Sequence, residues 1–346
     1  MNGIFELLTE LDHLPEGFLQ VRATELYRIL PGPTLIHLRG RRSEPLFVSI
    51  LLHGNEDSGL LAIQSLLHKY TDQPLPRALS LFVGNVEAAR YGQRRLDSQA
   101  DYNRVWPGAA GVPGDEHRLM QEVVDRMAAR ALFASIDLHN NTGLNPHYAC
   151  INRLEHRFVH LALLFSRTVV YFTQPAGVQS AAFASLCPAV TVECGKPGML
   201  SGVEHAAGFV EATLHLSGFP AHPVPRGDVD LLHTLATVKL PESMEFSFGK
   251  GEIGLSLIAD IDHFNFRELP AGTPLGRFSL GPKVPLSVTD NNGKQLAERY
   301  FEVRNGQLLT RRPIMPAMLT RDERIIRQDC LCYLMERIEL EQLAKD

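Results

Sequence analysis

Residues 46–56 read LFVSILLHGNE, and this stretch decides the fold because it joins an apolar segment directly to a polar corner. Seven residues, apolar except for Ser49, have the length and composition of a buried strand. Asp57 and Ser58 follow the corner and can cap a helix that begins near Gly59. The stretch therefore predicts a strand that passes through a short polar turn into a helix.

The same alternation continues on both sides of this stretch, from Leu35 to Val192. Apolar segments of strand length predict strands, and segments with apolar residues four apart predict amphipathic helices. We expect strands at 35–38, 46–52, 79–83, 134–138, 169–172 and 189–192, and helices at 60–70, 116–131, 155–167 and 203–216. The turn at 39–43 is short enough for an antiparallel hairpin, so we expect an α/β fold with a mixed central sheet flanked by helices.

The character of the sequence changes near residue 218. Residues 218–225 read GFPAHPVP, which cannot continue a helix and resembles a linker. Beyond about residue 230, short alternating segments are separated by turn residues, which predicts a small all-β domain. We therefore expect a larger α/β domain over residues 1–225 and a smaller C-terminal β-rich domain over residues 226–346, as the length of 346 residues allows.

Composition excludes several functional classes. The net charge of −5 provides no basic excess to neutralise phosphates, so nucleic acid is not an expected partner. The longest apolar runs are far shorter than the roughly 20 residues that a membrane span requires. Five scattered cysteines form no disulfide framework and no signal pattern is visible, so we expect a reduced, cytoplasmic protein. Oligomeric state stays open, a homo-oligomer included.

The corner after the first long strand has the chemistry of a metal site. His53 and Glu56 are three positions apart, so an imidazole nitrogen and a carboxylate can point at one zinc ion. His139 follows another apolar strand and is the candidate third ligand. Asp137 lies on the same side of that strand and can accept a hydrogen bond from a ligating imidazole. Two histidines and one carboxylate leave a fourth zinc position open for water, which is the catalytic arrangement.

Further polar residues supply what a zinc hydrolase needs besides the metal. Glu193 stands at the end of the strand 189–192, where it could act as general base. Segment 90–97, RYGQRRLD, offers guanidinium groups for a developing oxyanion. Asn103 and Arg104 are suited to hold a substrate carboxylate, because arginine grips a carboxylate with two parallel hydrogen bonds.

Together and in this order, the motifs resemble those of the succinylglutamate desuccinylase/aspartoacylase family within the zinc carboxypeptidase superfamily. The matching segments are HGNE at 53–56, GN at 84–85 with Ala88, RR at 94–95, DYNR at 101–104, DLHN at 137–140 and ECG at 193–195. The resemblance covers about residues 46–200. It implies one zinc ion per chain, held by His53, Glu56 and His139, with Glu193 as the general base.

The resemblance also assigns roles to the arginines. In the family, one arginine polarises the scissile carbonyl, and an Asn-Arg pair, here Asn103-Arg104, holds the carboxylate of the substrate. Counting forward from Asn85 places the polarising role on Arg94, whereas counting back from Arg104 places it nearer Arg95. We favour Arg94 as the catalytic residue and expect Arg95 on the substrate side.

The chain also departs from the family pattern. Aspartoacylases carry another arginine shortly before the general base, but residues 168–192 contain no Arg, Lys or His. A second substrate carboxylate is therefore not expected on that side, which disfavours strict aspartoacylase activity. Trp106 gives the loop after Arg104 an aromatic wall, which indicates an apolar part in the substrate. Tyr300 is the candidate for the tyrosine that reaches the pocket from the second domain of aspartoacylases.

We predict a zinc-dependent hydrolase that cleaves the amide bond of an N-acyl amino acid or a related small carboxylate. One alternative is a zinc metallocarboxypeptidase that acts on short peptides. Another is a binding protein that retains the metal without catalysis, although such a protein has no chemical need for Glu193. A serine hydrolase finds no support, because the chain contains no Gly-x-Ser-x-Gly elbow. The sequence identifies neither the acyl group nor the amino acid.

Overall fold

A computed structural model describes residues 7–225, 227–249, 254–279, 281 and 283–339. These residues form two compact units. Unit 1 contains the described residues of 1–140 and 147–231 together with Glu339, and unit 2 contains the loop 141–146 together with the described residues of 232–338. The domain boundary expected at residues 225–226 stays a prediction, and the two units are described separately below.

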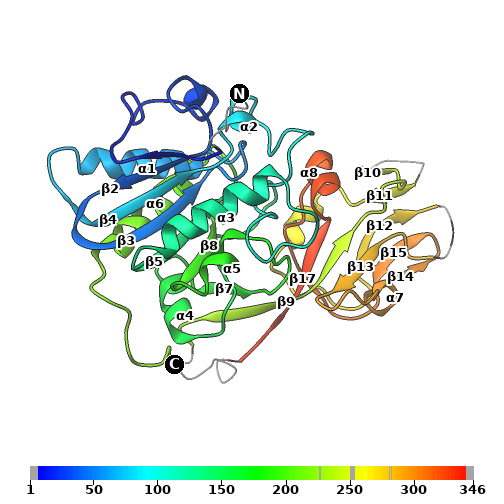
Figure 1. Ribbon diagram of the computed structural model, residues 1–346. Coiled ribbons are helices and arrows are strands. Elements are labelled where there is room, and N and C mark those ends of the chain that lie inside the picture. The colour runs from blue at the N-terminus through cyan, green and yellow to red at the C-terminus, as the bar shows by residue number, and fades with distance from the viewer. Residues whose placement is uncertain (1–6, 226, 250–253, 280, 282, 340–346) are drawn as a thin grey trace. The chain divides into compact units, whose positions relative to one another are not determined.

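Unit 1 is built on a mixed sheet with the strand order β1-β2-β4-β3-β5-β8-β6-β7 (Figure 1). The strands are β1 (Thr9–Leu11), β2 (Thr34–Leu38), β3 (Gly40–Ile50), β4 (Leu75–Val83), β5 (Ala134–His139), β6 (Tyr148–Ile151), β7 (Thr168–Tyr171) and β8 (Ala189–Glu193). Strands β4, β3, β5 and β8 are adjacent in that order and run parallel to one another. Strand β2 pairs antiparallel with β4, and β6 pairs antiparallel with β8. The mixed central sheet predicted from the sequence is confirmed.

Helices cover both faces of this sheet. They are α1 (Ser58–Lys69), α2 (Val86–Arg90), α3 (Asp115–Ala128), α4 (His156–Leu163), α5 (Gln179–Phe183) and α6 (Leu200–His215), with a 3-10 helix, η1 (Ala23–Arg28). Helices α1 and α6 pack together on one face, and α3 lies on the other (Figure 1). The apolar stripe of α3 is buried against the sheet, as its spacing predicts.

The hairpin expected at residues 39–43 is wrong. Strand β3 begins at Gly40, and β4 lies between β2 and β3, antiparallel to β2 and parallel to β3. The chain crosses the start of β4 so closely that a Cβ atom at Gly40 would lie 2.1 Å from the carbonyl carbon of Arg77. Glycine permits this crossing because it has no Cβ atom.

The direction in which successive strands are added to the sheet reverses at β3. The connection from β3 leads outward to β4, whereas the connection from β4 returns across β3 to β5 on its other side. In parallel α/β sheets, such a reversal leaves a crevice outside the carboxyl ends of the two neighbouring strands. His53 follows β3, and His139 ends β5, so both histidines lie at the carboxyl ends of these two neighbouring strands.

The core beneath the sheet is aromatic and includes a residue that we expected elsewhere. Trp106 is 0% exposed and packs edge-on against Phe82 and Phe183, while Phe183 stacks on Phe47. The expected aromatic wall of a substrate pocket is therefore wrong at Trp106. Its large apolar ring adds more stability when buried in the core than when lining a wet loop.

Unit 2 is largely β-structure. Strand β9 (Asp230–Lys239) pairs antiparallel with β13 (Ser287–Asp290) and β17 (Cys332–Arg337), and β17 pairs with β16 (Met315–Ala317). A separate sheet has the order β10-β11-β12-β15-β14, formed by Phe246–Phe248, Leu255–Leu257, Pro274–Phe278, Gln307–Thr310 and Phe301–Arg304. Short helices are η2 (Ile261–Phe264), α7 (Ala297–Tyr300) and α8 (Glu323–Gln328). Tyr300 belongs to the apolar core of this unit and is 6% exposed.

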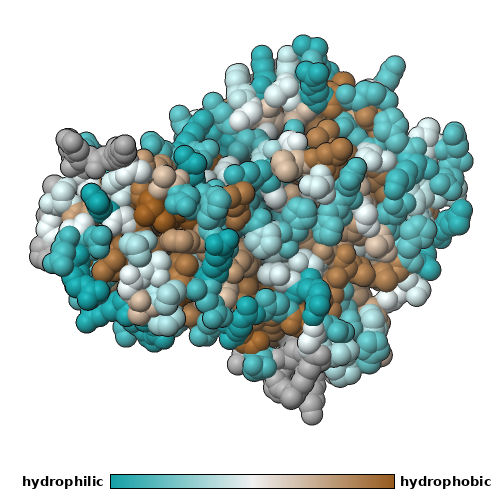
Figure 2. All heavy atoms as spheres, turned by 180° about the vertical axis from the view of Figure 1, so that it is seen from behind, coloured by the Kyte–Doolittle hydropathy of each residue, from teal (hydrophilic) through white to brown (hydrophobic). Residues whose placement is uncertain are grey.

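Hydrophilic side chains cover most of the face seen in Figure 2, with smaller hydrophobic patches between them. Within the described part of the chain, no helix combines the length and the apolar composition that crossing a membrane would need.

Candidate metal centre and its surroundings

The corner that carries His53 and Glu56 is held tightly against α2. Leu51, just after β3, adopts a left-handed backbone conformation with φ of 54°, which turns the chain sharply out of the strand. A Cβ atom at Gly54 would lie 2.2 Å from the backbone nitrogen of Ala89, so only glycine fits there. The Gly54 N–H donates to the carbonyl of Arg94, which ties the corner to the arginine segment.

Three candidate ligands converge in one buried cluster. Glu56 Oε1 lies 2.8 Å from His53 Nδ1, and Glu56 Oε2 lies 2.7 Å from His139 Nδ1. One ligand atom from each of the three residues lies within 4.8 Å of the others, and each residue is at most 5% exposed. The structure thus brings together the three residues that the sequence proposed as zinc ligands.

Both imidazoles are oriented from behind by carboxylates. His53 Nε2 lies 3.0 Å from Asp101 Oδ1, and His139 Nε2 lies 2.8 Å from Asp137 Oδ2. Ser49 Oγ donates to the other oxygen of Asp137 at 2.6 Å. A histidine whose Nε2–H is held by a carboxylate presents the lone pair of Nδ1 to a metal. The donor set therefore fits a zinc ion between the two Nδ1 atoms and Glu56.

The charges of the cluster are strongly coupled. Burial would raise the pKa of Glu56, but the charges of His53 and His139 outweigh burial and hold that pKa well below its usual value. For His139, burial would lower the pKa, but Asp137 and Glu56 raise it well above 6.5. Glu56 is therefore ionised at neutral pH and ready to bind a cation.

Arg94, but not Arg95, lies beside the cluster. Arg94 Nε and Nη2 both donate to Asp101 Oδ2, at 3.1 and 3.0 Å, and Arg94 Nη1 lies 3.7 Å from Glu56 Oε1. Arg95 Nη1 instead donates to the carbonyls of Leu96 and Gln99 within its own loop. The structure thus places Arg94 next to a candidate ligand and turns Arg95 toward the loop backbone.

The orientation of the Asn103 side chain is set by the backbone of Gln179. Its Oδ1 accepts the N–H of Gln179 at 3.0 Å, so its amide NH₂ must point the other way, where Nδ2 lies 3.2 Å from His139 Nε2. Arg104 is half-buried, and its Nη1 donates to the carbonyl of Asn103 at 2.8 Å. Asn103 therefore lies beside the candidate ligand His139, and the guanidinium of Arg104 lies against the backbone of Asn103.

Glu193 ends β8, directly beside His139 at the end of β5. The two residues are register partners in the parallel pair, and the Cys194 N–H donates to the His139 carbonyl at 2.8 Å. Glu193 is 8% exposed. Burial and the charge of Glu193 raise the pKa of the Cys150 and Cys194 thiols well above 9, so both thiols stay neutral beside it.

Sequence reasoning missed the roles of Asp101, Ser49 and Asn140. Asp101 was quoted only as part of the DYNR motif, yet its carboxylate joins His53 to Arg94 and accepts the Asn103 N–H. Asn140 donates its backbone N–H to Glu56 and its side chain accepts the N–H of Ser58. A polar Ser49 within an otherwise apolar strand was the one visible signal, because a hydroxyl buried in a strand needs a partner.

Comparison with known proteins agrees with this arrangement. Residues 45–214 match the family described as the succinylglutamate desuccinylase/aspartoacylase catalytic domain. No curated protein sequence matches the chain. The matched segment contains every candidate residue of the cluster, from His53 to Glu193.

Several solved structures share the fold. The succinylglutamate desuccinylase from Chromobacterium violaceum is 18% identical, with a TM-score of 0.56 over 87% of this chain and 86% of that one. A succinylglutamate desuccinylase/aspartoacylase from Rhodobacter sphaeroides is 15% identical, with a TM-score of 0.57 over 87% and 88%. Murine aminoacylase 3 is 15% identical, with a TM-score of 0.52 over 86% and 96%. The fold class predicted from the sequence is thereby confirmed.

Proposed function

Since its residues 45–214 make this chain a member of the succinylglutamate desuccinylase/aspartoacylase family, we propose that it is a zinc-dependent deacylase. It would hydrolyse the amide bond of an N-acyl amino acid or a related small carboxylate. The observation that carries the proposal is the buried cluster of His53, Glu56 and His139, whose ligand atoms lie within 4.8 Å of one another. Its donor set leaves a zinc position open for catalysis.

Glu193 is the group that moves the proton. His53, Glu56 and His139 would hold the zinc ion, which would supply Lewis-acid chemistry at the scissile carbonyl and the attacking water. Glu193 would take a proton from the water while the oxygen of that water bonds to the amide carbon. Glu193 would then give the proton to the leaving nitrogen as the C–N bond breaks. Its place beside His139 at the strand ends supports this role.

The remaining residues bind and orient the substrate. Asn103 Nδ2 can donate to a substrate oxygen, because the Asn103 Oδ1 atom is already engaged by Gln179. Arg104, beside it, would pair with the substrate carboxylate. Arg94 would donate to the oxygen that becomes negative when the carbonyl is attacked, and Asp101 holds its guanidinium in place. Arg95 takes no part in this scheme, because its guanidinium donates to carbonyls of its own loop.

The substrate would carry a single carboxylate, with no second one facing the segment that leads to Glu193. Residues 168–192, which lead to Glu193, contain no cationic side chain that could hold a second one. A cytoplasmic location is proposed as well, because all five cysteines are free thiols, as suits a reducing compartment. Residues 1–225 would form the catalytic domain and residues 226–346 a β-rich domain.

A hydrolysis panel tests the proposal. The purified protein is incubated with N-succinyl, N-acetyl and aromatic-acyl amino acids and with short peptides, with and without a chelator. We expect chelator-sensitive release of the free amino acid from at least one N-acyl substrate. Hydrolysis of peptides alone would favour a metallocarboxypeptidase, and bound zinc without any turnover would favour a binding protein.

A variant pair tests the mechanism within the same assay. Glu193→Gln should retain zinc but lose about 10²- to 10⁴-fold in turnover, the usual contribution of a general base. The control is Glu204→Gln, which removes an exposed carboxylate from α6 and should leave turnover unchanged. Wild-type turnover in Glu193→Gln would refute the assigned role.

A further inference from the structure

A second polar site lies at the opposite end of the strands from the metal cluster. Arg42 is near the start of β3, Phe133 precedes β5 and Pro188 precedes β8, whereas the metal cluster and Glu193 are at the carboxyl ends of the same strands. The strands are parallel, so these residues lie together at the amino ends of the strands. The five residues of β8, at roughly 3.3 Å each, separate the amino ends of the strands from their carboxyl ends by about 16 Å.

A cavity of about 830 Å³ opens at the amino ends of the strands, and its lining contains several arginines. Its charged residues are the four arginines Arg42, Arg77, Arg130 and Arg157 and one carboxylate, Glu44. The rings of Phe133 and Phe219 also line it and stack with centroids 5.0 Å apart. The cavity thus combines four guanidinium groups with an apolar surface, although Arg130 and Arg157 also pair with Glu10 and Glu155 outside the lining.

Arg42 and Arg77 are held against each other. They are register partners on β3 and β4, and both donate to the carbonyl of Leu216, at 2.6 and 2.9 Å. Arg42 also donates to the carbonyl of His215, so the pair caps the C-terminal end of α6. Capping explains why one arginine lies here, but two like charges on one carbonyl oxygen also repel each other.

The protein compensates this charge incompletely. Arg77 is 2% exposed and stacks over the Phe133 ring at 3.6 Å, yet its Nε is buried with no hydrogen-bond partner in the described part of the chain. The single carboxylate of the lining, Glu44, is 3.7 Å from Arg77 Nη1 and half-exposed. Burial and the neighbouring Arg42 both lower the pKa of Arg77, as expected of a cation short of negative partners.

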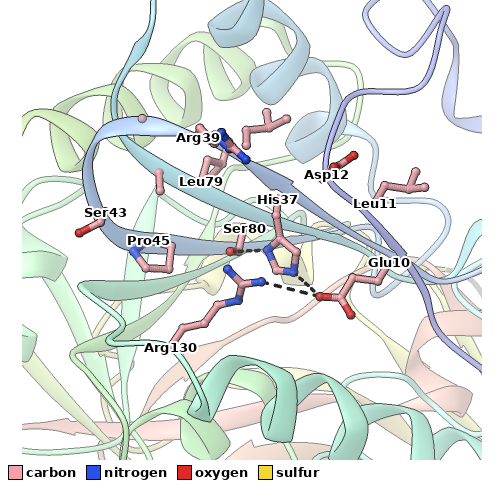
Figure 3. A pocket seen from close by; sticks show the side chains of 13 residues that line it. Glu10, Leu11, Asp12, His37, Arg39, Ser43, Pro45, Leu79, Ser80 and Arg130 are labelled. Carbon is pink, nitrogen blue, oxygen red and sulfur yellow. Dashed lines mark hydrogen bonds and ion pairs between the residues drawn. The ribbon is translucent and has the colours of Figure 1, made fainter.

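An adjacent cavity of about 790 Å³ provides a contrast (Figure 3). There, His37 joins Ser80 and Glu10, at 2.9 and 2.8 Å, and the Arg130 guanidinium faces the same Glu10 carboxylate at 3.8 Å. His37 and Arg130 therefore share the Glu10 carboxylate as their partner in that cavity. Arg42 differs from them, because its partners within the described part of the chain are carbonyl oxygens and not a carboxylate.

We propose that this cavity binds a small oxyanion, a phosphate or carboxylate group of a metabolite, through Arg42, Arg77 and Arg157. An oxyanion accepts charge-assisted hydrogen bonds from several guanidinium groups at once, and Arg42 retains donors beyond the Nη1 that caps α6. An apolar part of the same ligand would lie on the Phe133–Phe219 pair. The ligand would not reach the metal cluster, so this site is separate from the proposed deacylase site.

The test is calorimetric titration of the zinc-loaded full-length protein with inorganic phosphate and, in a second arm, with succinate. We expect saturable binding of at least one of the two anions, and the arm that binds identifies the source of the negative charge. Arg42→Gln should weaken binding at least tenfold. Its control is Arg41→Gln, the exposed neighbour outside the cavity lining, which should bind as the wild type does.

A second pair guards against loss of the α6 cap. Arg157→Gln changes a lining residue on α4 that does not cap α6, and it should also weaken binding. Arg153→Gln is its control, because Arg153 pairs with the same Glu155 but lies outside the lining. Absence of saturable binding in both arms, or binding that Arg42→Gln and Arg157→Gln leave unchanged, would overturn the proposal.

Discussion

At the scale of single residues, the candidate metal centre depends on two carboxylates that bind no metal themselves. Asp101 holds Nε2 of His53, and Asp137 holds Nε2 of His139, each within 3.0 Å. Ser49 in turn holds Asp137 from the neighbouring strand. Such partners choose the tautomer of a ligating imidazole and aim its free nitrogen, so their removal should weaken the site without removing a ligand.

We predict that Asp137→Asn lowers zinc affinity about 10- to 100-fold, because the amide cannot accept the imidazole proton as strongly. Ser49→Ala should have a smaller effect in the same direction, since Ser49 acts only through Asp137. Competition with a chromophoric chelator measures both. Asp125→Asn, at an exposed position of α3, is the control. Equal zinc affinity in Asp137→Asn and Asp125→Asn would contradict the role assigned to Asp137.

Residue types and their order were enough to predict which side chains meet at the metal centre. They could not decide between Arg94 and Arg95, because neighbouring residues in an irregular loop face different directions and only the tertiary path selects one. The same limit explains Trp106. A loop after a functional motif suggested a pocket wall, whereas packing against Phe82 and Phe183 placed the ring in the core.

At the scale of elements, α6 approaches the end of β8 through a glycine. A Cβ atom at Gly202 would lie 2.0 Å from the carbonyl oxygen of Cys194, the residue after Glu193. Gly208 is in the same helix, but a Cβ atom there would meet nothing within 4 Å. The two glycines therefore provide a matched pair within one helix.

We predict that Gly202→Ala lowers the free energy of unfolding by about 1–3 kcal/mol, because the helix or the strand end must shift. Gly208→Ala should raise it by about 0.4–1 kcal/mol, since alanine restricts the unfolded chain and suits a helix better. Urea unfolding measures both. A stabilising Gly202→Ala would show that α6 does not pack closely on Cys194.

The sequence predicted the long elements well because each carries several periods of its hydrophobic pattern. The predicted strand 134–138 corresponds to β5, and the helix 116–131 corresponds to α3. Strand β6, at Tyr148–Ile151, was missed although β7 of the same length was predicted, because Ala149 and Cys150 favour a strand less than the β-branched Val169 and Val170 do. The false hairpin at 39–43 had a different cause. Turn chemistry describes neighbours in sequence and cannot reveal that β4 pairs between β2 and β3.

At the scale of the whole molecule, the metal-free protein should lose stability as the pH rises above neutrality. The folded-state pKa of His139 lies well above its usual value of 6.5. Its contribution is therefore complete below pH 6.5 and is lost as the pH rises through the folded pKa. His37, His147 and His233 have lowered pKa values and titrate below this range.

We predict that the free energy of unfolding of the metal-free protein falls as the pH rises above the usual histidine pKa of 6.5, with a slope of at most about 1.4 kcal/mol per pH unit for this one group. Urea unfolding at several pH values measures the slope. His139→Asn should abolish this slope, and so should zinc, because a ligating imidazole is already unprotonated. An undiminished slope in His139→Asn would assign the effect to other groups.

The molecule thus has two chemically distinct ends to one set of parallel strands. The carboxyl ends carry the candidate metal ligands and Glu193, where the strand order reverses at β3. The amino ends carry the arginine cavity. No sequence motif pointed to this cavity, because Arg42, Arg77 and Arg157 are far apart in the chain and meet only through the pairing of β3 with β4 and the packing around it.

The measurement that tests the central claim most directly is zinc content by elemental analysis after reconstitution and dialysis. The account predicts about one zinc per chain in the wild type and in Glu193→Gln, and far less in His53→Ala, Glu56→Ala and His139→Ala. Circular dichroism would verify that each variant is folded. A wild type without zinc, or folded ligand variants that keep it in full, would contradict the account.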